Sequence, residues 1–527
     1  MKKKRLVFFA LASACVLMLT MTAAPQARRA KIIRPVVKPA AAAADWSTLV
    51  NISNTPAASE SPVLALDAKG NAYVCWTEWI GFGMARNMMF NTNESGQWPA
   101  SKTIAPLLYD AIDDVGFPTV VAYPEGGKAF VGYHDADFSR MVMAIVGWEY
   151  SNGGFGSKEI ISYGAPSSSY GTLALSPTDN NIYAVWMSDI DGQFGLVIRY
   201  RDPNTRQWSA GDIINVPMSD YLANLFIDSK GTAHLVWITR PYGSIVWYSK
   251  NPTPKNVGAW SAPFQVTPNS GLNWTYPKVT ADGDGDAYVV WQEVAAGNIE
   301  VMLRRTVNGG WQATENISQT GDLSETASIA VNPTTKEMYI AWQELVGGSN
   351  WEIFVKTYEI DKASGTKKWS NITNFSNSPY HSGEPCFRVA ANGDVHLAFY
   401  DQLGGPDNNW MSREIMYTYK QKVRVYAPSN VVLTTSLNKI LFYSEKMNTI
   451  TFAKNAENDD SLVANYKLYR RKPEEADDKF VLLTTLTTTT FKYEDRKLPL
   501  NQKYAYALST IDKDGNESPK TTAVVEK

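Results

Sequence analysis

A pattern of two short apolar strands recurs along most of this 527-residue chain. In each copy an apolar strand leads through a turn, commonly of the type Asp-x-x-Gly, into a second apolar strand that ends in an aromatic residue. The second strands are AYVCW (72–76), AFVGY (129–133), IYAVW (182–186), AHLVW (233–237), AYVVW (287–291), MYIAW (338–342) and VHLAF (395–399). Successive copies lie 51 to 57 residues apart. Short strands that repeat at this period predict an all-β fold, a seven-bladed β-propeller.

A tryptophan marks a further strand in most copies, so each blade is expected to have four strands. The markers are Trp46, Trp98, Trp208, Trp260, Trp311 and Trp369, with Phe155 in the second copy. In the fifth copy we expect strands at 277–280, 287–292 and 300–304 and one that starts at Trp311. The marker at Trp46 precedes every first strand, whereas the seventh copy ends at 414–420 without one. The N-terminal strand is therefore expected to complete the seventh blade, which removes an exposed sheet edge.

The second strands are continuously apolar, which predicts that both of their faces are covered by neighbouring blades. Glycines recur in the turn that precedes them, at Gly70, Gly231, Gly285 and Gly393. A tight turn of this kind places one residue in the left-handed region, which glycine adopts without strain.

The two ends of the chain differ from the repeats. Residues 1–24 carry a basic start and an apolar run, which is typical of a secretory signal peptide. A lipoprotein signal that uses Cys15 is the alternative. Residues 25–45 are rich in Ala, Pro, Arg and Lys and are expected to be a disordered spacer. The propeller is assigned to 46–422 and a further domain to 423–527, and no later segment is long and apolar enough to span a membrane.

The charge of the chain limits the classes of binding partner, and its cysteine content indicates the state of the thiols. The formal net charge is -2, but the first 45 residues hold nine Lys or Arg and one acid, so the remainder carries -10. An acidic surface disfavours nucleic acid and anionic membranes as partners. After removal of the signal only Cys75 and Cys386 remain, and we expect two buried free thiols in preference to a disulfide.

The last hundred residues resemble a fibronectin type III domain. They carry NTITF (448–452), YKLYRR (466–471) and LPLNQKYAY (498–506) in the order of that family. The resemblance implies that Phe452 stands at the core tryptophan position. It also implies that Leu498 and Tyr504 form the tyrosine corner, in which the phenol bonds to the backbone.

The repeats themselves resemble the sialidase-like, BNR-type propellers of bacterial secreted and surface proteins. The shared sequence pattern is a Trp, followed by Asn-Ile-Ser and then by P-x-V-A-x-D-x-x-G-N-x-Y-V-x-W. It recurs between Trp46 and Lys420. The family's Ser-x-Asp-x-Gly-x-x-Trp box is missing, and its catalytic arginines, tyrosine and glutamate cannot be mapped onto this chain. The resemblance therefore implies a propeller, with glycan chemistry as an open expectation.

An acid follows the aromatic end of the second strand in six of the seven copies. These acids are Glu78, Asp135, Asp189, Glu293, Glu344 and Asp401, whereas the fourth copy has Thr239 and Arg240. A ring of carboxylates at one rim is suited to bind sugar hydroxyls or cations, or to supply an acid and base pair. The alternative, which we favour, is that each carboxylate caps backbone amides of a neighbouring loop.

Loops expected on the same rim carry aromatic side chains that are suited to stack on sugar rings. They are Trp79, Phe82, Tyr242, Trp274, Trp351, Tyr380 and Trp410. Trp351 begins a third strand, so a position wedged between blades is the alternative for it.

Other chemical signals are weak. His234 and His396 replace Tyr73 and Tyr288 in second strands and are expected to be core residues, whereas His134 and His381 are open candidates. The run 282–286, Asp-Gly-Asp-Gly-Asp, resembles a calcium loop, but it coincides with a turn and lacks the distal glutamate. We expect no metal and no cofactor.

These patterns predict a secreted, cell-surface or periplasmic monomer that binds a glycan or a surface protein without catalysis. A glycosidase or polysaccharide lyase that uses rim carboxylates, or His134 and Tyr133, is the alternative, and a structural envelope protein is the third. The candidate ligand-binding residues are Glu78, Trp79, Arg240, Tyr242, Trp274, Glu293, Glu344, Trp351, Asp401 and Trp410.

Overall fold

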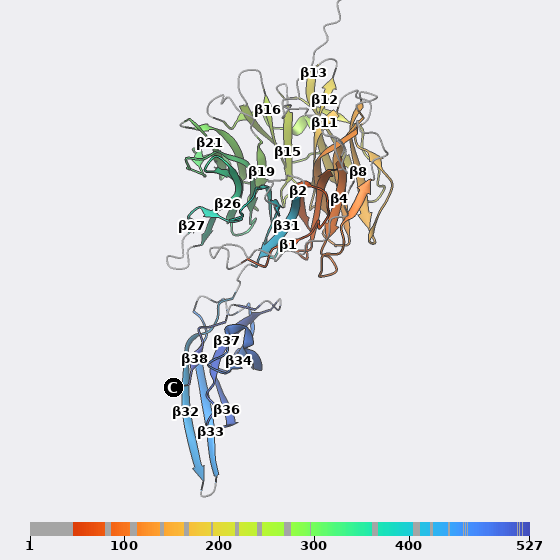
Figure 1. The fold of residues 1–527 in the computed structure, drawn as a ribbon. Helices are drawn as coiled ribbons and strands as arrows, with labels where there is room; N and C mark the ends of the chain where they lie inside the picture. Colours follow the sequence, from red (N-terminus) through yellow and green to blue (C-terminus); the bar gives the residue numbers. More distant parts are fainter. Residues whose placement is uncertain are drawn as a thin grey trace, which may run out of the picture. The chain divides into compact units, whose positions relative to one another are not determined.

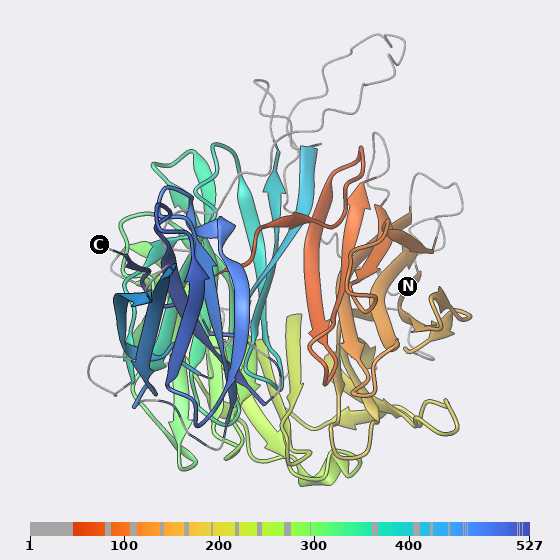
Figure 2. The same ribbon diagram turned by 90° about the horizontal axis from the view of Figure 1, so that it is seen from below.

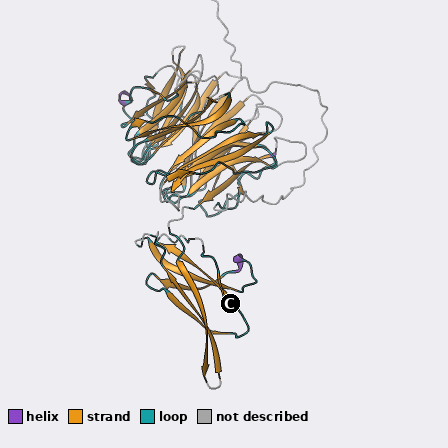
Figure 3. Cartoon of the chain, turned by 90° about the vertical axis from the view of Figure 1, so that its left-hand side faces the viewer, coloured by secondary structure: helices purple, strands orange, loops and turns teal. Residues whose placement is uncertain are grey.

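The computed structural model describes residues 46–526 with gaps. The gaps are 80–85, 106–112, 138–141, 163–167, 191–192, 217–220, 240–244, 268–275, 296, 361–366, 404–411, 422–424, 441–442, 457, 459, 461, 514, 516 and 519. The predicted signal peptide and spacer lie outside the described residues. The described chain is all-β, with short 3₁₀ turns such as η2 (Val257–Ala259) and η4 (Asp477–Lys479) (Figure 3). None of its helices is long and apolar enough to cross a bilayer.

Seven antiparallel sheets account for the described strands between Trp46 and Lys420. The first contains β2 (Ser59–Leu66), β3 (Ala72–Trp79), β4 (Arg86–Thr92) and β5 (Lys102–Ala105). The second contains β6 (Asp113–Ala122), β7 (Lys128–Asp137), β8 (Val142–Ser151), β9 (Gly154–Phe155) and β10 (Glu159–Ile160). The third contains β11 (Ser168–Leu175), β12 (Ile182–Ile190), β13 (Gln193–Arg201) and β14 (Asp212–Ile214). The fourth contains β15 (Tyr221–Ile227), β16 (Ala233–Thr239), β17 (Ile245–Asn251) and β18 (Phe264–Gln265).

The later sheets follow the same order. The fifth contains β19 (Lys278–Ala281), β20 (Ala287–Ala295), β21 (Asn298–Val307), β22 (Gly310–Trp311) and β23 (Glu315–Asn316). The sixth contains β24 (Ser324–Val331), β25 (Met338–Val346), β26 (Asn350–Ile360), β27 (Lys367–Trp369) and β28 (Thr373–Asn374). The seventh contains β29 (Ser382–Val389), β30 (Val395–Gln402), β31 (Arg413–Lys420) and β1 (Val50–Asn51).

The first strands of the seven sheets contact one another in series. Each packs against the first strand of the next sheet, from β2 through β6, β11, β15, β19 and β24 to β29, and β29 also contacts β2. We call these seven strands the inner ring. Figure 1 shows β2, β15 and β19 in the middle of this part of the chain and later strands such as β21 and β27 at its edge.

The N-terminal strand belongs to the last sheet, as expected from the position of Trp46. β1 pairs antiparallel with β31, and the backbone N–H of Ile52 donates to the carbonyl of Ile415 at 2.9 Å. The red start of the repeats and the cyan strand β31 accordingly lie side by side in Figure 2. Segments more than 360 residues apart in sequence therefore share one sheet.

Apolar side chains fill the space between successive sheets. One hydrophobic cluster joins the first and second sheets through Tyr73, Phe90 and Val131, and another joins the fifth and sixth through Val290 and Trp342. The strands β3 and β16 are buried along nearly their whole length, as predicted for strands covered on both faces. The indoles of Trp76, Trp237, Trp291 and Trp342 are fully buried.

Polar side chains near the outer strands bind the backbone of the preceding sheet. Arg199 donates to the carbonyl of Ile161 at 2.6 Å, and Arg304 donates to that of Val266 at 2.7 Å. The tryptophan markers add a second contact, since the Trp208 indole N–H donates to Glu159 at 2.8 Å. The marker therefore connects neighbouring sheets as well as opening a strand.

The turns into the second strands have the predicted geometry. Gly70, Gly231, Gly285 and Gly393 all have φ between 83° and 90°. In the loop 282–286 the Asp282 carboxylate accepts backbone N–H bonds from Asp284 and Asp286, and the Lys336 ammonium lies 3.1 Å from the same carboxylate. A lysine thus supplies the positive charge in this turn. Cys75 and Cys386 are buried free thiols.

The C-terminal segment forms two further sheets. One contains β32 (Ser429–Ile440), β33 (Tyr443–Ala453) and β36 (Lys492–Leu498), and the other contains β35 (Val481–Thr487), β34 (Val463–Arg471), β37 (Ala505–Asp512) and β38 (Val524–Val525). Phe452 and Tyr466, from opposite sheets, share one hydrophobic cluster. The tyrosine-corner expectation is wrong for Tyr504: its ring lies 4.7 Å from the Arg470 guanidinium and, between described residues, its hydroxyl forms no backbone bond.

Glu414 on β31 holds the N-terminal segment in the seventh sheet. The Ser53 hydroxyl and the Thr55 backbone N–H both donate to its carboxylate. Burial, reinforced by the nearby charge of Glu78, raises the pKa of Glu414 to about 7 from 4.5. Because the folded protein holds this proton more tightly than the unfolded chain does, the free energy of unfolding falls as pH rises through this interval.

We predict that Glu414→Gln reduces the loss of stability between about pH 5 and about pH 8, because glutamine keeps the two acceptor contacts without a charge. Urea unfolding at both pH values measures the difference. Glu125→Gln, on an exposed turn, is the control. A pH dependence equal to that of the wild type would contradict the role of Glu414.

Candidate functional site

The predicted rim carboxylates bind side chains at the ends of their own sheets. Glu344 accepts bonds from the Trp342 indole at 2.8 Å and the Ser324 hydroxyl at 3.2 Å. Glu293 accepts the Trp291 indole N–H at 2.8 Å. The partners are indole and hydroxyl groups, whereas the sequence led us to expect backbone amides.

Asp401 and Glu78 are held in the same way. Asp401 accepts a bond from the Ser382 hydroxyl at 2.8 Å, and Glu78 accepts one from Thr55 at 2.6 Å. Burial raises the pKa of the Glu78, Glu344 and Asp401 carboxyls. These hydrogen bonds account for the repeated acid as part of the sheet ends.

A second set of acids, which the sequence analysis missed, stands directly opposite the first. Glu300, Glu352 and Glu414 on the third strands pair in register with Glu293, Glu344 and Asp401. Each accepts a hydrogen bond from the serine that ends an N-I-S or N-F-S phrase: Ser318, Ser376 and Ser53. The signal in the sequence was this recurrent serine together with Asn-x-Glu at 298–300 and 350–352.

The structure describes only some of the remaining ligand-binding candidates. Trp351 is half-buried, and its backbone N–H donates to Nδ1 of His381 at 3.1 Å. Arg240, Tyr242, Trp274 and Trp410 lie outside the described residues. Trp79 is described, and its surroundings connect it to the inner ring.

Trp79 contacts Arg86 and shares the Glu60 carboxylate with Arg413. Its indole N–H donates to the Glu60 carboxylate at 2.8 Å, and the Arg86 guanidinium lies 4.2 Å from the ring centroid. Arg413 forms an ion pair with the same Glu60 and lies 4.7 Å from the ring of Tyr400. Glu60 belongs to β2, so this cluster joins the last sheet to the inner ring.

Six inner-ring strands contain a β-bulge at the same place. The register shifts there, and one residue adopts φ between 50° and 56°. These residues are Ser61, Phe117, Tyr170, Leu222, Thr326 and Glu384. Tyr276 stands at the matching sequence position in the fifth sheet, since it precedes Pro277 as Ser61, Phe117 and Glu384 precede prolines. A residue other than glycine keeps a positive φ only where the surrounding structure enforces it. Here the same backbone conformation recurs in six copies of the repeat.

The bulge residues differ in chemistry around the ring. On one side Phe117 is 45% exposed and Tyr276 is 38% exposed. The rings of Phe117 and Tyr170 meet edge to face with centroids 4.6 Å apart. This side offers exposed aromatic surface.

The other side is acidic. Glu384 accepts the Ser61 backbone N–H at 2.6 Å, and its own backbone N–H donates to Gln343 at 3.1 Å. Burial raises the pKa of Glu384, and the charge of Glu60 raises it further. Burial also raises the pKa of Tyr276, with additional contributions from the carboxylates of Glu325 and Glu384. The charges of both carboxylates therefore act on the Tyr276 phenol.

We call Glu60, Phe117, Tyr170, Tyr276, Glu325 and Glu384 the bulge-ring site. His134 borders it, with its ring centroid 6.1 Å from that of Phe117. Burial lowers the pKa of His134 to about 4, so the imidazole is neutral near pH 7. Its Nε2 atom is buried and has no hydrogen-bond partner in the described part of the chain. No group of three or more metal-ligating side chains occurs in the described ranges.

Comparison with known proteins gives similarity at the level of fold. No family model matches the chain, and no curated protein matches it. A fungal alcohol oxidase of the AA5 family, in complex with copper, is 11% identical over 91% of this chain and 98% of its own, with a TM-score of 0.43. The NanB sialidase of Streptococcus pneumoniae is 10% identical over 71% and 70%, with a TM-score of 0.41. A leech intramolecular trans-sialidase is 11% identical over 70% and 68%, with a TM-score of 0.40. These values assign neither a family nor an activity to this chain.

The hydrogen bonds of Glu344 predict a structural effect when it is removed. We expect Glu344→Ala to lower the free energy of unfolding by about 1–3 kcal/mol, because the buried Trp342 indole loses its acceptor. Urea unfolding measures this change. Glu344→Gln retains an acceptor and is the matched control. Unchanged stability in Glu344→Ala would show that this carboxylate does not support the sheet end.

Proposed function

We propose that this chain is a secreted or surface-exposed monomer that binds a glycan at the bulge-ring site without catalysis. In this proposal residues 46–422 form a closed seven-bladed propeller of the sialidase-like type. Residues 423–527 form a fibronectin type III domain that serves as a spacer or contact module. The basic and apolar start of the chain supports export, and the acidic remainder disfavours nucleic acid as a partner.

The contacts of the inner ring support the architecture. The first strands of the seven sheets contact one another in series, and the last of them, β29, contacts the first, β2. This arrangement is expected of a closed propeller. The joining of β1 to the seventh sheet is consistent with closure by the N-terminal strand. For the C-terminal segment, sheets of three and four strands around Phe452 and Tyr466 fit the fibronectin type III arrangement.

One observation supports the functional proposal. Part of the bulge ring carries exposed aromatic rings, Phe117 and Tyr276, and the rest carries the carboxylates of Glu60, Glu325 and Glu384. Sugar rings have apolar C–H faces that stack on aromatics and hydroxyl groups that donate to carboxylates. Tyr276 combines both, since its ring is 38% exposed and the charges of Glu325 and Glu384 act on its phenol. Glu325 and Glu384 lie on inner-ring strands and Tyr276 lies two residues before β19, so the backbone preorganises the site.

A glycosidase is the second candidate, favoured by the electrostatic effect of Glu60 on Glu384. Burial, and then the charge of Glu60, raise the pKa of Glu384. Glycosidases use two carboxyl groups, one with a raised pKa as the acid and the other as base or nucleophile. Product analysis of any bound glycan separates this candidate from simple binding.

Glycan-array binding of the purified protein tests the proposal. We expect binding to weaken by about tenfold in Tyr276→Ala and in Phe117→Ala, because truncating a central aromatic contact typically removes more than about 1 kcal/mol of binding free energy. Ile213→Ala, an exposed apolar change on the outer strand β14, is the control and should bind as the wild type.

Each outcome of the array decides between candidates. Binding without products supports the proposal. Products that disappear in Glu60→Gln and Glu384→Gln support the glycosidase. Absence of binding to every glycan, or equal binding by Tyr276→Ala and the wild type, would overturn the bulge ring as a glycan site.

A further inference from the structure

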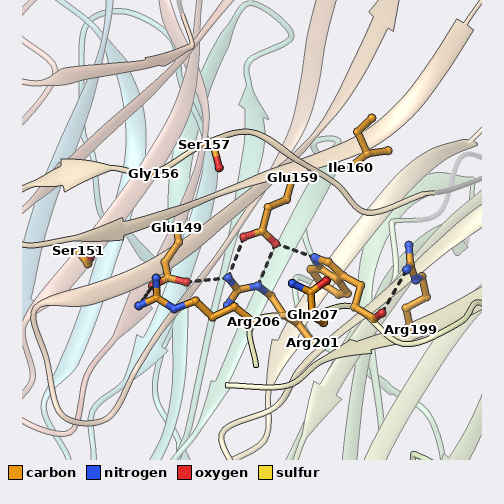
Figure 4. Close-up of a pocket in the computed structure, with 11 residues that line it drawn as sticks. Glu149, Ser151, Gly156, Ser157, Glu159, Ile160, Arg199, Arg201, Arg206 and Gln207 are labelled. Carbon is orange, nitrogen blue, oxygen red and sulfur yellow. Dashed lines mark hydrogen bonds and ion pairs between the residues drawn. The ribbon is translucent and has the colours of Figure 1, made fainter. Parts of the chain in front are cut away.

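A cavity of 580 Å³ lies away from the inner ring, between the outer strands of the second and third sheets. Its charged lining comes from Glu149, Glu159, Arg199, Arg201 and Arg206, beside Trp208 (Figure 4). None of the ligand-binding residues predicted from the sequence lines it. The volume lies within the range of about 300–1,000 Å³ that is typical of small-molecule sites.

Arg201 forms the floor of this cavity and is fully engaged. It is 2% exposed and binds Glu159 through two bonds of 2.9 and 2.8 Å and Glu149 through one of 2.8 Å. Its remaining terminal nitrogen lies 3.4 Å from the Tyr123 hydroxyl. A buried guanidinium between two carboxylates is a rigid framework that links the two sheets.

The two carboxylates cannot neutralise the charge of all three arginines. Arg199 donates to the backbone carbonyls of Ile161 and Ser209, at 2.6 and 2.5 Å, and burial lowers its pKa. Arg206 is 61% exposed and lies 3.3 Å from Glu149, which it shares with Arg201. Three guanidinium groups and two carboxylates thus line the cavity, which gives it a net charge of +1, whereas residues 46–527 as a whole carry -10.

The remaining lining is polar and rich in donors. Ser151, Ser157 and Gln207 border the cavity, and Ile160 is the one large aliphatic residue among those that line it. Hydroxyl and amide groups around an exposed guanidinium suit a ligand that carries several hydroxyls and one carboxylate. A neutral apolar ligand would leave these donors unpaired.

We propose that this cavity is a second binding site, which takes a carboxylated sugar such as glucuronate. The carboxylate binds the open side of the Arg206 guanidinium. The sugar hydroxyls bind Ser157 and Gln207. Arg201, Glu149 and Glu159 position these groups without contacting the ligand. This inference does not depend on the bulge-ring site, because the two sites share no residue.

Titration of the purified protein with glucuronate, followed by calorimetry, tests the site. We expect glucuronate to bind at least about tenfold more tightly than glucose, because only glucuronate has a carboxylate that can form a charge-assisted bond with Arg206. Arg206→Gln should lose about tenfold in affinity and Arg206→Lys should lose less, because lysine restores the charge without the planar fork. Arg496→Gln, which removes an exposed guanidinium that also pairs with a glutamate, is the control.

The outcomes separate this proposal from that for the bulge ring. Glucuronate binding that Arg206→Gln weakens and Tyr276→Ala leaves unchanged establishes the second site. Equal affinity for glucose and glucuronate overturns the role of the carboxylate. No binding of glucuronate, or binding that is unaffected in Arg206→Gln, overturns the site itself.

Discussion

The burial of apolar side chains between neighbouring sheets is the constraint on which the rest of this structure depends. Second strands such as β3 and β16 are apolar on both faces, so neither face can be left to water. A sheet of this kind is stable only between two others, and a series of such sheets ends without an exposed face only if it returns to its start. Here β29 of the last sheet contacts β2 of the first, and β1 pairs with β31 at the edge of the last sheet.

The polar groups are arranged by the same constraint. At the ends of strands that are packed between two sheets, buried donors and acceptors must form hydrogen bonds with other protein groups, because water is excluded. Paired acids such as Glu344 and Glu352 are tolerable because hydroxyl and indole groups bind them and because burial raises the pKa of both. The recurrence of an acid at the end of the second strand thus follows from the recurrence of the fold, and function has to be sought where the copies differ. They differ at the bulges of the inner ring.

The sequence predicted the features that depend on local spacing. The seven second strands, the left-handed glycines and the position of Trp46 follow from apolar runs and turn residues, which are local signals. Phe452 was assigned to the core of the last domain and lies there. The fate of Tyr504 was not predictable in this way, because its partner Arg470 lies on another strand, β34.

The candidate sites were less predictable, for a physical reason. A bulge has no composition of its own, and the residue that it turns toward the ring can be Ser61, Phe117 or Glu384. The Pro that follows each of these three was the available signal, but Tyr170 and Leu222 lack it. The outer cavity depends on Arg201 meeting acids 42 and 52 residues away, a pairing created only when two sheets pack.

The inner ring and the outer cavity also differ in charge, which limits what each is suited to hold. At the bulge ring the charges of Glu325 and Glu384 act on the Tyr276 phenol, so an anionic group placed beside Tyr276 would meet like charge. Between the second and third sheets the excess is positive, and Arg206 is open to solvent. The two proposed sites therefore require ligands of different charge, a neutral sugar at the bulge ring and a carboxylated sugar in the outer cavity.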